Sequence, residues 1–241
     1  MNLPARVKVV EVGPRDGLQN EKETVPQDVK VAFIDALTDA GLPVIEVGAF
    51  VRPDRIPQMA DSGEVLTRIR RRKGTVYSAL VPNRQGYARA AAAKAGEIGV
   101  FTAASEAFAA KNINATISES IERFAEFVPD AKKAGIRVRA YVSTCWVCPY
   151  AGKVEARAVA DLAKRLLDLK ADEISLGDTV GAAVPSEVER TVKTLLDAGI
   201  PAAKLAFHGH DTRGTALANV LSALQSGVAT IDSSAGGLGG C

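Results

Sequence analysis

Apolar and polar positions in this chain follow two periods, which predict strands and helices in regular succession. Short apolar runs suited to buried strands alternate with longer segments whose apolar residues recur at helical spacing. Strands are predicted at residues 7–12, 43–47, 76–81, 97–101, 136–143, 173–176, 204–207 and 229–232. Helices are predicted at residues 26–40, 63–72, 118–134, 155–169, 186–198 and 212–225, with a further helix after Asn83.

This alternation predicts the fold. Strands that are each followed by a helix imply parallel pairing with right-handed crossovers. Eight such units in 241 residues fit a (β/α)₈ TIM barrel better than an open sheet. No G-x-G-x-x-G segment follows the first strand, so a dinucleotide-binding fold has little support. We therefore expect residues 1–241 to form a single α/β barrel domain with its chemistry at the carboxyl ends of the strands.

Composition and charge narrow the range of partners. The hydrophobic content of 47% and the charged content of 24% are those of an ordinary soluble globular protein. A net charge of +2 favours neither nucleic acid nor a membrane surface as a partner, and no apolar run could span a bilayer. The first residues run directly into a strand without a signal-peptide core or a transit segment. With only three cysteines, these features indicate a reducing compartment and a cytoplasmic protein.

Polar residues gather where the predicted strands end. Charged side chains inside apolar strands are costly to bury without a partner, so their grouping needs an explanation. One alternative is a ring of ion pairs that only holds the barrel mouth together; the other is an active site. The residues concerned are Arg15 and Asp16 after the first strand, Glu46 in the second, Asp178 after the sixth, and His208 and His210 after the seventh.

His208 and His210 are the only histidines of the chain. In an extended segment, residues two apart point to the same side, so both imidazoles face one place. Neutral imidazole is the commonest metal ligand in proteins, which favours a shared metal site over two unrelated core histidines. Two histidines alone do not make such a site, and carboxylates from other strands must complete it.

Cys145 and Cys148 form a C-x-x-C pair. Such a pair can be a redox centre, but that usually occurs in another fold context. The chain has no second pair that could complete a structural zinc site. We therefore expect two packed thiols at the end of a strand.

The segment GPRDGLQN at residues 13–20 resembles the hydroxymethylglutaryl-CoA lyase family. The arginine–aspartate segment and H-x-H also occur in the related Claisen condensation synthases, whereas the terminal GLGGC, with KNIN and PRDGLQ, is more specific to the lyases. The resemblance covers essentially the whole chain. It continues at residues 50–61 (FVRPDRIPQMAD), 111–114 (KNIN), 148–150 (CPY), 175–179 (SLGDT), 207–211 (FHGHD) and 236–241 (GGLGGC).

The resemblance implies roles for the residues at the strand ends. By similarity, Asp16, His208 and His210 hold a divalent metal ion, Mg²⁺ or Mn²⁺, with which a mixed nitrogen and oxygen ligand set is compatible. Arg15 is implied to stabilise negative charge on the thioester oxygen, which suits its fork of donors. Cys241 is implied to be the acid that protonates the departing acetyl-CoA carbanion.

Further roles are implied less directly. Gln19, Lys111 and Asn112 are expected to contact the acyl-CoA substrate. Glu46 and Asp178 are expected to orient the site or to help handle the hydroxyl proton, for which His208 is another possible base. The resemblance also implies a homodimer and a part in leucine degradation.

The implied reaction is a retro-Claisen cleavage of 3-hydroxy-3-methylglutaryl-CoA to acetyl-CoA and acetoacetate. Three alternatives remain open at this point. The first is a lyase for a related 3-hydroxyacyl-CoA, because fold and metal site do not fix the acyl pocket. The second is a Claisen condensation synthase that uses acetyl-CoA and a 2-oxo acid, which would not need Cys241. The third is a barrel that binds metal or acyl-CoA without catalysis.

The chain departs from the family pattern in two places. The family has a further metal-ligating Asn beyond the cysteine and a helix that closes the barrel, but the sequence ends at Cys241. We therefore expect the natural protein to continue, and this chain to be a barrel truncated before its C-terminal helices. Val147 also stands where the family often has Gly, which would alter one wall of the site.

Overall fold

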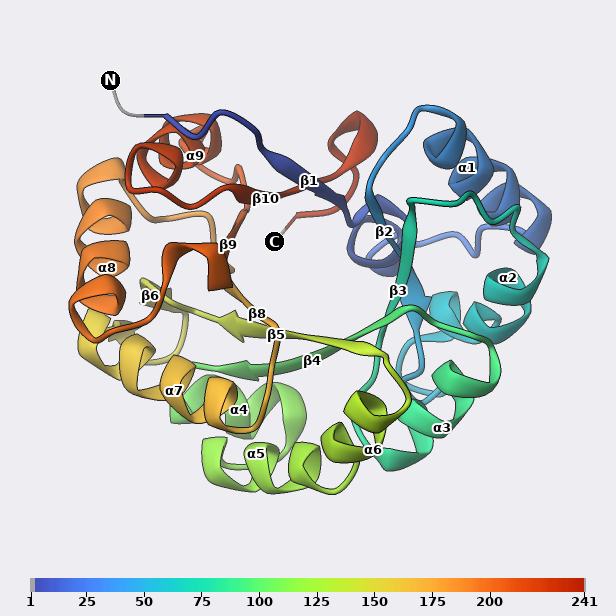
Figure 1. Ribbon diagram of the computed structural model, residues 1–241, viewed down its shortest axis with the longest axis horizontal. Coiled ribbons are helices and arrows are strands. Elements are labelled where there is room, and N and C mark those ends of the chain that lie inside the picture. Colours follow the sequence, from blue (N-terminus) through green and yellow to red (C-terminus); the bar gives the residue numbers. More distant parts are fainter. Residues whose placement is uncertain (1–2, 241) are drawn as a thin grey trace.

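The computed structural model describes residues 3–240, and in it eight parallel strands close into a barrel (Figure 1). The order around the barrel is β1-β10-β9-β8-β5-β4-β3-β2. All eight predicted strands are present, and the predicted (β/α)₈ barrel is confirmed. The strands are β1 (Lys8–Glu11), β2 (Val44–Ala49), β3 (Val76–Leu80), β4 (Glu97–Ala103), β5 (Arg137–Ser143), β8 (Glu173–Asp178), β9 (Leu205–Gly209) and β10 (Thr230–Ser233).

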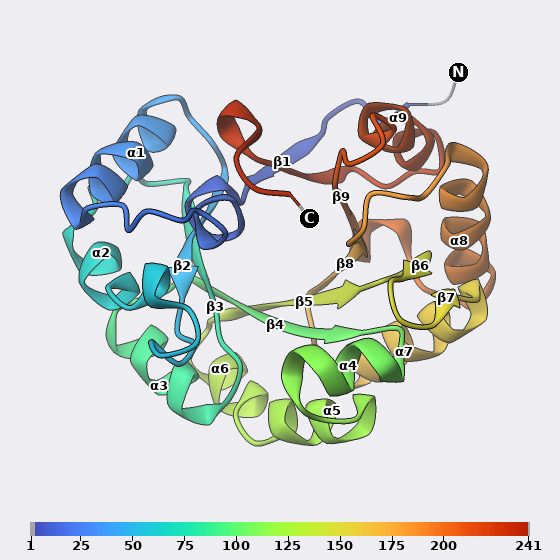
Figure 2. The ribbon, with the colours of Figure 1, turned by 180° about the vertical axis from the view of Figure 1, so that it is seen from behind.

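The helices form a ring outside the strands, as Figures 1 and 2 show from opposite sides. Their apolar faces pack on the outward faces of the strands in one core, where Ile34, Leu66 and Leu166 are among the fully buried side chains. Each such side chain contributes about 1.5–3 kcal/mol by leaving water. The helices are α1 (Gln27–Asp39), α2 (Ser62–Arg68), α3 (Arg84–Ala92), α4 (Glu106–Ile113), α5 (Ile117–Ala125), α6 (Val128–Lys133), α7 (Ala156–Asp168), α8 (Pro185–Asp197) and α9 (Ala216–Gln225).

The predicted helix at residues 118–134 is wrong in its start and in its continuity. It is two helices, α5 and α6, and the first begins at Ile117, one residue before Ser118. Thr116 is the N-cap, and its side chain and that of Glu119 form a capping box. Pro129 stands in the first turn of α6, where its missing N–H is harmless, although the same residue would break a continuous helix.

Two elements were not predicted, and both follow barrel strands on the side where chemistry is expected. Helix α4 comes after β4 and is capped by Ser105, whose hydroxyl accepts the N–H of Phe108. The antiparallel hairpin of β6 (Val147–Cys148) and β7 (Gly152–Lys153) comes after β5. Cys145 and Cys148 are buried free thiols, as expected.

The interior of the barrel contains buried ion pairs as well as apolar side chains. Arg139 is fully buried, and it pairs with Asp232 at 2.6 Å and with Glu173 at 3.0 Å. Lys8 reaches the same Glu173 from β1. Burying a charge without a partner is costly, and here Arg139 meets one carboxylate from β8 and one from β10.

The outward face of β1 and β10 is apolar, with Val7 exposed just before β1, Val9 partly buried and Ile231 buried. After β10, the described residues contain the short 3₁₀ turn η4 (Ala235–Gly237) and no α-helix. Across residues 3–240, none of the helices is both long and apolar enough to cross a membrane.

Candidate active site

A π-helical turn, η1 (Gly13–Gly17), carries Arg15 and Asp16 from the end of β1 into the barrel mouth. The N–H groups of Asp16 and Gly17 donate to the carbonyl of Val12 at 2.7 and 3.3 Å, which closes the wide turn. Such turns are rare and are frequent at functional sites. A β-carbon at Gly13 would lie 2.5 Å from a carboxylate oxygen of Glu11, so a larger residue there would displace that carboxylate.

Glu11 connects this turn to the glycine-rich end of the chain. Its Oε1 accepts the N–H groups of Gly13 and Ala235 at 2.8 and 2.9 Å. Gly239 then passes so close to Gly17 that a β-carbon on it would lie 2.9 Å from the Gly17 α-carbon. Glu11 therefore has a structural role, because it holds the segment after β10 against η1.

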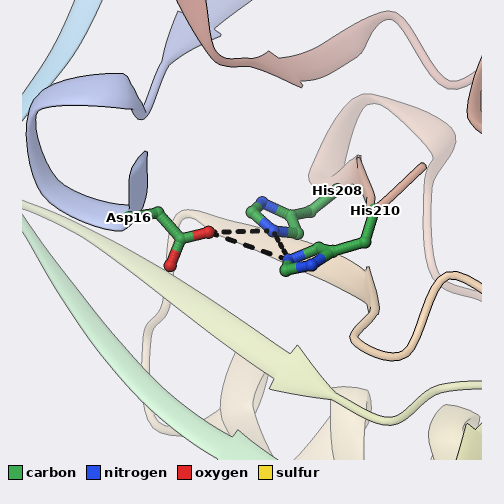
Figure 3. Close-up of side chains that lie close together, drawn as sticks. All are labelled: Asp16, His208 and His210. Carbon is green, nitrogen blue, oxygen red and sulfur yellow. Dashed lines mark hydrogen bonds and ion pairs between the residues drawn. The ribbon is translucent and has the colours of Figure 1, made fainter. Parts of the chain in front are cut away.

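Asp16, His208 and His210 converge on one point at the mouth (Figure 3). The two Nε2 atoms of the histidines lie 3.0 Å apart. The Oδ2 atom of Asp16 lies 3.4 Å from Nε2 of His208 and 3.8 Å from Nε2 of His210. The imidazoles face the same side of the chain, as their spacing predicted.

These three side chains fit a divalent metal ion. Two donor atoms about 2.1 Å from an ion, and at right angles to each other, lie about 3 Å apart. The donor atoms lie 3.0, 3.4 and 3.8 Å apart, all less than the roughly 4.2 Å that separates two donors on opposite sides of one such ion. One carboxylate and two imidazoles also form a mixed ligand set that several divalent ions accept.

The surrounding charges favour the ionised carboxylate. Burial alone would raise the pKa of Asp16, but the charge of Arg15 and a hydrogen bond with His208 hold it well below its usual range. Burial alone would lower the pKa of His208, but hydrogen bonds to Asp16 and Asp232 raise it to about 9. Burial and the neighbouring charge of His208 lower the pKa of His210. Asp16 is thus a charged oxygen donor next to a neutral His210.

Arg15 is buried beside the three residues and is held by two carboxylates. Its Nε donates to Oε2 of Glu46 at 2.6 Å, and its Nη1 donates to Oδ1 of Asp16 at 2.5 Å. The ring of Tyr141 lies 5.5 Å from the guanidinium carbon. Glu46 is completely buried, and its Oε1 has no hydrogen-bond partner within residues 3–240. Glu46 therefore fixes Arg15 and leaves one oxygen free.

Asp178 is buried near the site, but its carboxylate is used by the following loop. Its oxygens accept the N–H groups of Ala182 and Ala183, each at 3.1 Å. Its backbone carbonyl accepts the N–H of His210 at 3.4 Å. In this structure Asp178 shapes the loop and supports His210 through the backbone.

The residues expected to contact substrate are more peripheral. Lys111 and Asn112 are exposed on α4. The Nζ atom of Lys111 lies 4.3 Å from the ring centroid of Tyr150, and Asn112 donates to the carbonyl of Phe108 at 3.1 Å. Gln19 is partly exposed just beyond η1. Cys241 lies outside the described residues.

Sequence reasoning missed Asp232 and Arg139. Asp232 accepts a hydrogen bond from His208 and pairs with Arg139, so it belongs to the same buried network. Both are charged residues at buried positions of strands, β10 and β5, and a charged residue inside a predicted strand is a sign that could have found them. The segments around them predicted strands, but no functional role for either residue.

A cleft of about 790 Å³ opens over these residues. Asp16, His208 and His210 line one part of it, and Leu238 and Gly239 come from the glycine-rich segment. The rest of the cleft runs along the apolar outer side of β1, β10 and α9, where its lining includes Val9, Val220 and Ile231. The arrangement can bind a metal ion beside the buried cation of Arg15.

Comparisons with known proteins agree with this geometry. The model of the family described as HMGL-like matches residues 6–241. A relative named hydroxymethylglutaryl-CoA lyase, mitochondrial, from Bos taurus is 51% identical over 239 residues, which are 99% of this chain and 73% of that protein. The solved structure of hydroxymethylglutaryl-CoA lyase from Pseudomonas aeruginosa is 47% identical with a TM-score of 0.97, over 100% of this chain and 80% of that one.

A second solved structure bears on the ligand. It is an HMG-CoA lyase from Acinetobacter baumannii in complex with coenzyme A and 3-methylmalate. It is 39% identical to this chain with a TM-score of 0.94, over 98% of this chain and 77% of that one.

Proposed function

The chain belongs to the HMGL-like family, and from this premise we propose that it cleaves 3-hydroxy-3-methylglutaryl-CoA into acetyl-CoA and acetoacetate. The observation that carries the proposal is the convergence of Asp16, His208 and His210 beside the buried Arg15. A lyase of this kind needs a site for a metal ion and a cation for the thioester oxygen, and both lie at one barrel mouth. The relative with bound coenzyme A supports an acyl-CoA as the substrate.

The proposed metal is Mg²⁺ or Mn²⁺, held by Asp16, His208 and His210. Such an ion would supply Lewis acidity that lowers the pKa of the substrate's tertiary hydroxyl group. The protein's part is to present one carboxylate and two imidazoles that converge on one point, as Figure 3 shows. Because the pKa of His208 is about 9 in the metal-free site, binding of the ion would release a proton from that ring.

Arg15 would meet the negative charge that develops on the thioester oxygen during cleavage. Its guanidinium is buried and is fixed by Glu46 and Asp16, so it needs little reorganisation when that charge appears. Hydrogen-bond donors that are already oriented stabilise a transition state more than donors that must first break their hydrogen bonds to water and reorient. Glu46 and Tyr141 are then the groups that keep Arg15 in place.

Two proton transfers complete the reaction. The tertiary hydroxyl loses its proton as the bond between C2 and C3 breaks, and its oxygen becomes the ketone oxygen of acetoacetate. The bonding electron pair passes to the thioester enolate, whose C2 then takes a proton to give acetyl-CoA. Glu46 is our preferred acceptor for the first proton, because burial raises its pKa and its Oε1 has no partner in the described part of the chain. Cys241 is our proposed donor of the second.

A panel of acyl-CoA thioesters tests this proposal. The metal-loaded protein should release acetyl-CoA from 3-hydroxy-3-methylglutaryl-CoA faster than from other 3-hydroxyacyl-CoA compounds. The same protein should not condense acetyl-CoA with a 2-oxo acid. If another thioester is cleaved faster, that compound is the substrate instead. If the protein catalyses condensation, the proposed reaction class is wrong.

A further inference from the structure

We propose that Asp232 is a positioning residue for the metal site, which fixes His208 so that its Nε2, rather than its Nδ1, faces Asp16 and His210. Asp232 stands on β10, beside Val10 of β1, and its side chain points into the barrel. The inference rests on the metal site of the proposed function, but not on its substrate.

The contact between Asp232 and His208 decides which ring nitrogen is free. Oδ2 of Asp232 lies 2.9 Å from Nδ1 of His208. A carboxylate can only accept, so Nδ1 must carry the hydrogen. Nε2 lies 3.0 Å from His210 and 3.4 Å from Asp16, and in the metal-free site it also carries a hydrogen that faces Asp16. When an ion displaces that proton, the neutral ring keeps its hydrogen on Nδ1, and Nε2 carries the lone pair. Metal-ligating histidines commonly donate their second N–H to a carboxylate in this manner.

Asp232 is itself held firmly. Nη2 of Arg139 donates to its Oδ1 at 2.6 Å, and Oγ of Ser175 donates to its Oδ2 at 3.2 Å. Arg139 is held in turn by Glu173, on the side away from the mouth. The carboxylate therefore stays charged and keeps one orientation, so that His208 has one fixed acceptor.

The ring of His208 is also fixed on its flank. Tyr141 meets it edge to face, with the ring centroids 6.3 Å apart, and the same tyrosine lies over Arg139 at 4.9 Å. His210 is different, because its Nδ1 has no hydrogen-bond partner among residues 3–240. The two ligands are therefore unequal: Asp232 fixes the tautomer of His208, whereas nothing comparable in the described structure fixes that of His210.

The chain is well suited to a direct test, because His208 and His210 are its only histidines. Nitrogen-15 NMR of histidine-labelled, Mg²⁺-loaded protein reports which nitrogen of each ring carries hydrogen. We expect His208 to carry hydrogen on Nδ1, with Nε2 free of it. Hydrogen on Nε2 of His208 in the loaded protein would overturn the inference without any variant.

A variant tests the energetic consequence. Asp232→Asn keeps the shape of the side chain but removes its charge, and we expect Mn²⁺ affinity, measured by electron paramagnetic resonance, to fall about 10–100-fold. Ser175→Ala is the matched control, because it removes a neighbouring contact to Asp232 and leaves the contact with His208. It should bind Mn²⁺ within about threefold of the unaltered protein, since one neutral hydrogen bond is worth about 0.5–1.5 kcal/mol.

The outcomes separate this inference from the proposed function. If the unaltered protein binds Mn²⁺ and Asp232→Asn binds it equally well, the positioning role of Asp232 is wrong and the proposed metal site stands. If the unaltered protein binds no Mn²⁺, both fail together.

Discussion

Arg15 shows how closely one residue can be tied to both stability and chemistry. It is buried between Glu46 and Asp16, so its removal leaves the fully buried Glu46 without its cation. Breaking such a pair costs about 3–5 kcal/mol. A loss of activity after mutation must therefore be separated from a loss of fold.

We predict that Arg15→Gln lowers kcat by about two orders of magnitude, on the scale of losing one oxyanion donor. KM should change much less, because Arg15 meets a charge that appears only during cleavage. Steady-state kinetics measures both. Arg15→Lys is the control: it keeps a cation against Glu46, and thermal unfolding should show that it is the more stable variant. A change in KM alone would give Arg15 a binding role instead.

For individual residues, the sequence predicted which side chains converge on the site, but not which contacts hold them in place. His208 and His210 could be found because two histidines in phase on one strand are rare. Asp232 and Arg139 could not be found in the same way, because their partners lie on other strands and no sequence motif joins them. Their roles depend on contacts between β5 and β10, which are 93 positions apart along the chain.

Among the elements, periodicity predicted the barrel strands well and the connections poorly. Strand positions follow from apolar runs alone, whereas α4 and the β6–β7 hairpin depend on local caps and turns. The segment at residues 118–134 was misread because apolar spacing continues through the break between α5 and α6. Thr116 and Pro129, rather than that spacing, set the ends of these helices.

The capping box of α5 gives a prediction about the stability that one helix cap contributes. Thr116→Ala should lower the free energy of unfolding by about 1 kcal/mol, because the hydroxyl that accepts the N–H of Glu119 is lost. Ser118→Ala is the control, since that exposed hydroxyl only accepts a hydrogen bond from Arg165, and it should cost less than about 0.5 kcal/mol. Urea unfolding measures both values. Equal losses would remove Thr116 from its role as the cap.

For the whole molecule, the alternation of strands and helices was enough to predict a closed barrel, because few other folds use eight such units. It could not predict that charged side chains fill part of the interior. Alternation reports which face of a strand is buried, but not that Arg139 on β5 meets Asp232 on β10 across the barrel.

Metal binding should stabilise the whole barrel, because its ligands come from segments at opposite ends of the chain. The site joins η1 to the end of β9, and an unfolded chain has no such site. At a free Mn²⁺ concentration about 100 times Kd, the free energy of unfolding should rise by about 2.7 kcal/mol. Calorimetry in the presence of Mn²⁺ measures this, and His210→Ala should show almost none of the gain. An equal gain in that variant would place the ion elsewhere.

The central claim is that carbon–carbon cleavage depends on a metal ion held by Asp16, His208 and His210. The most direct test measures acetoacetate release from 3-hydroxy-3-methylglutaryl-CoA while bound Mn²⁺ is titrated, in the unaltered protein and in Asp16→Ala. We predict that the rate rises in proportion to bound metal, falls to background with a chelator, and stays at background in Asp16→Ala. Full cleavage by chelator-treated, metal-free protein would contradict the claim.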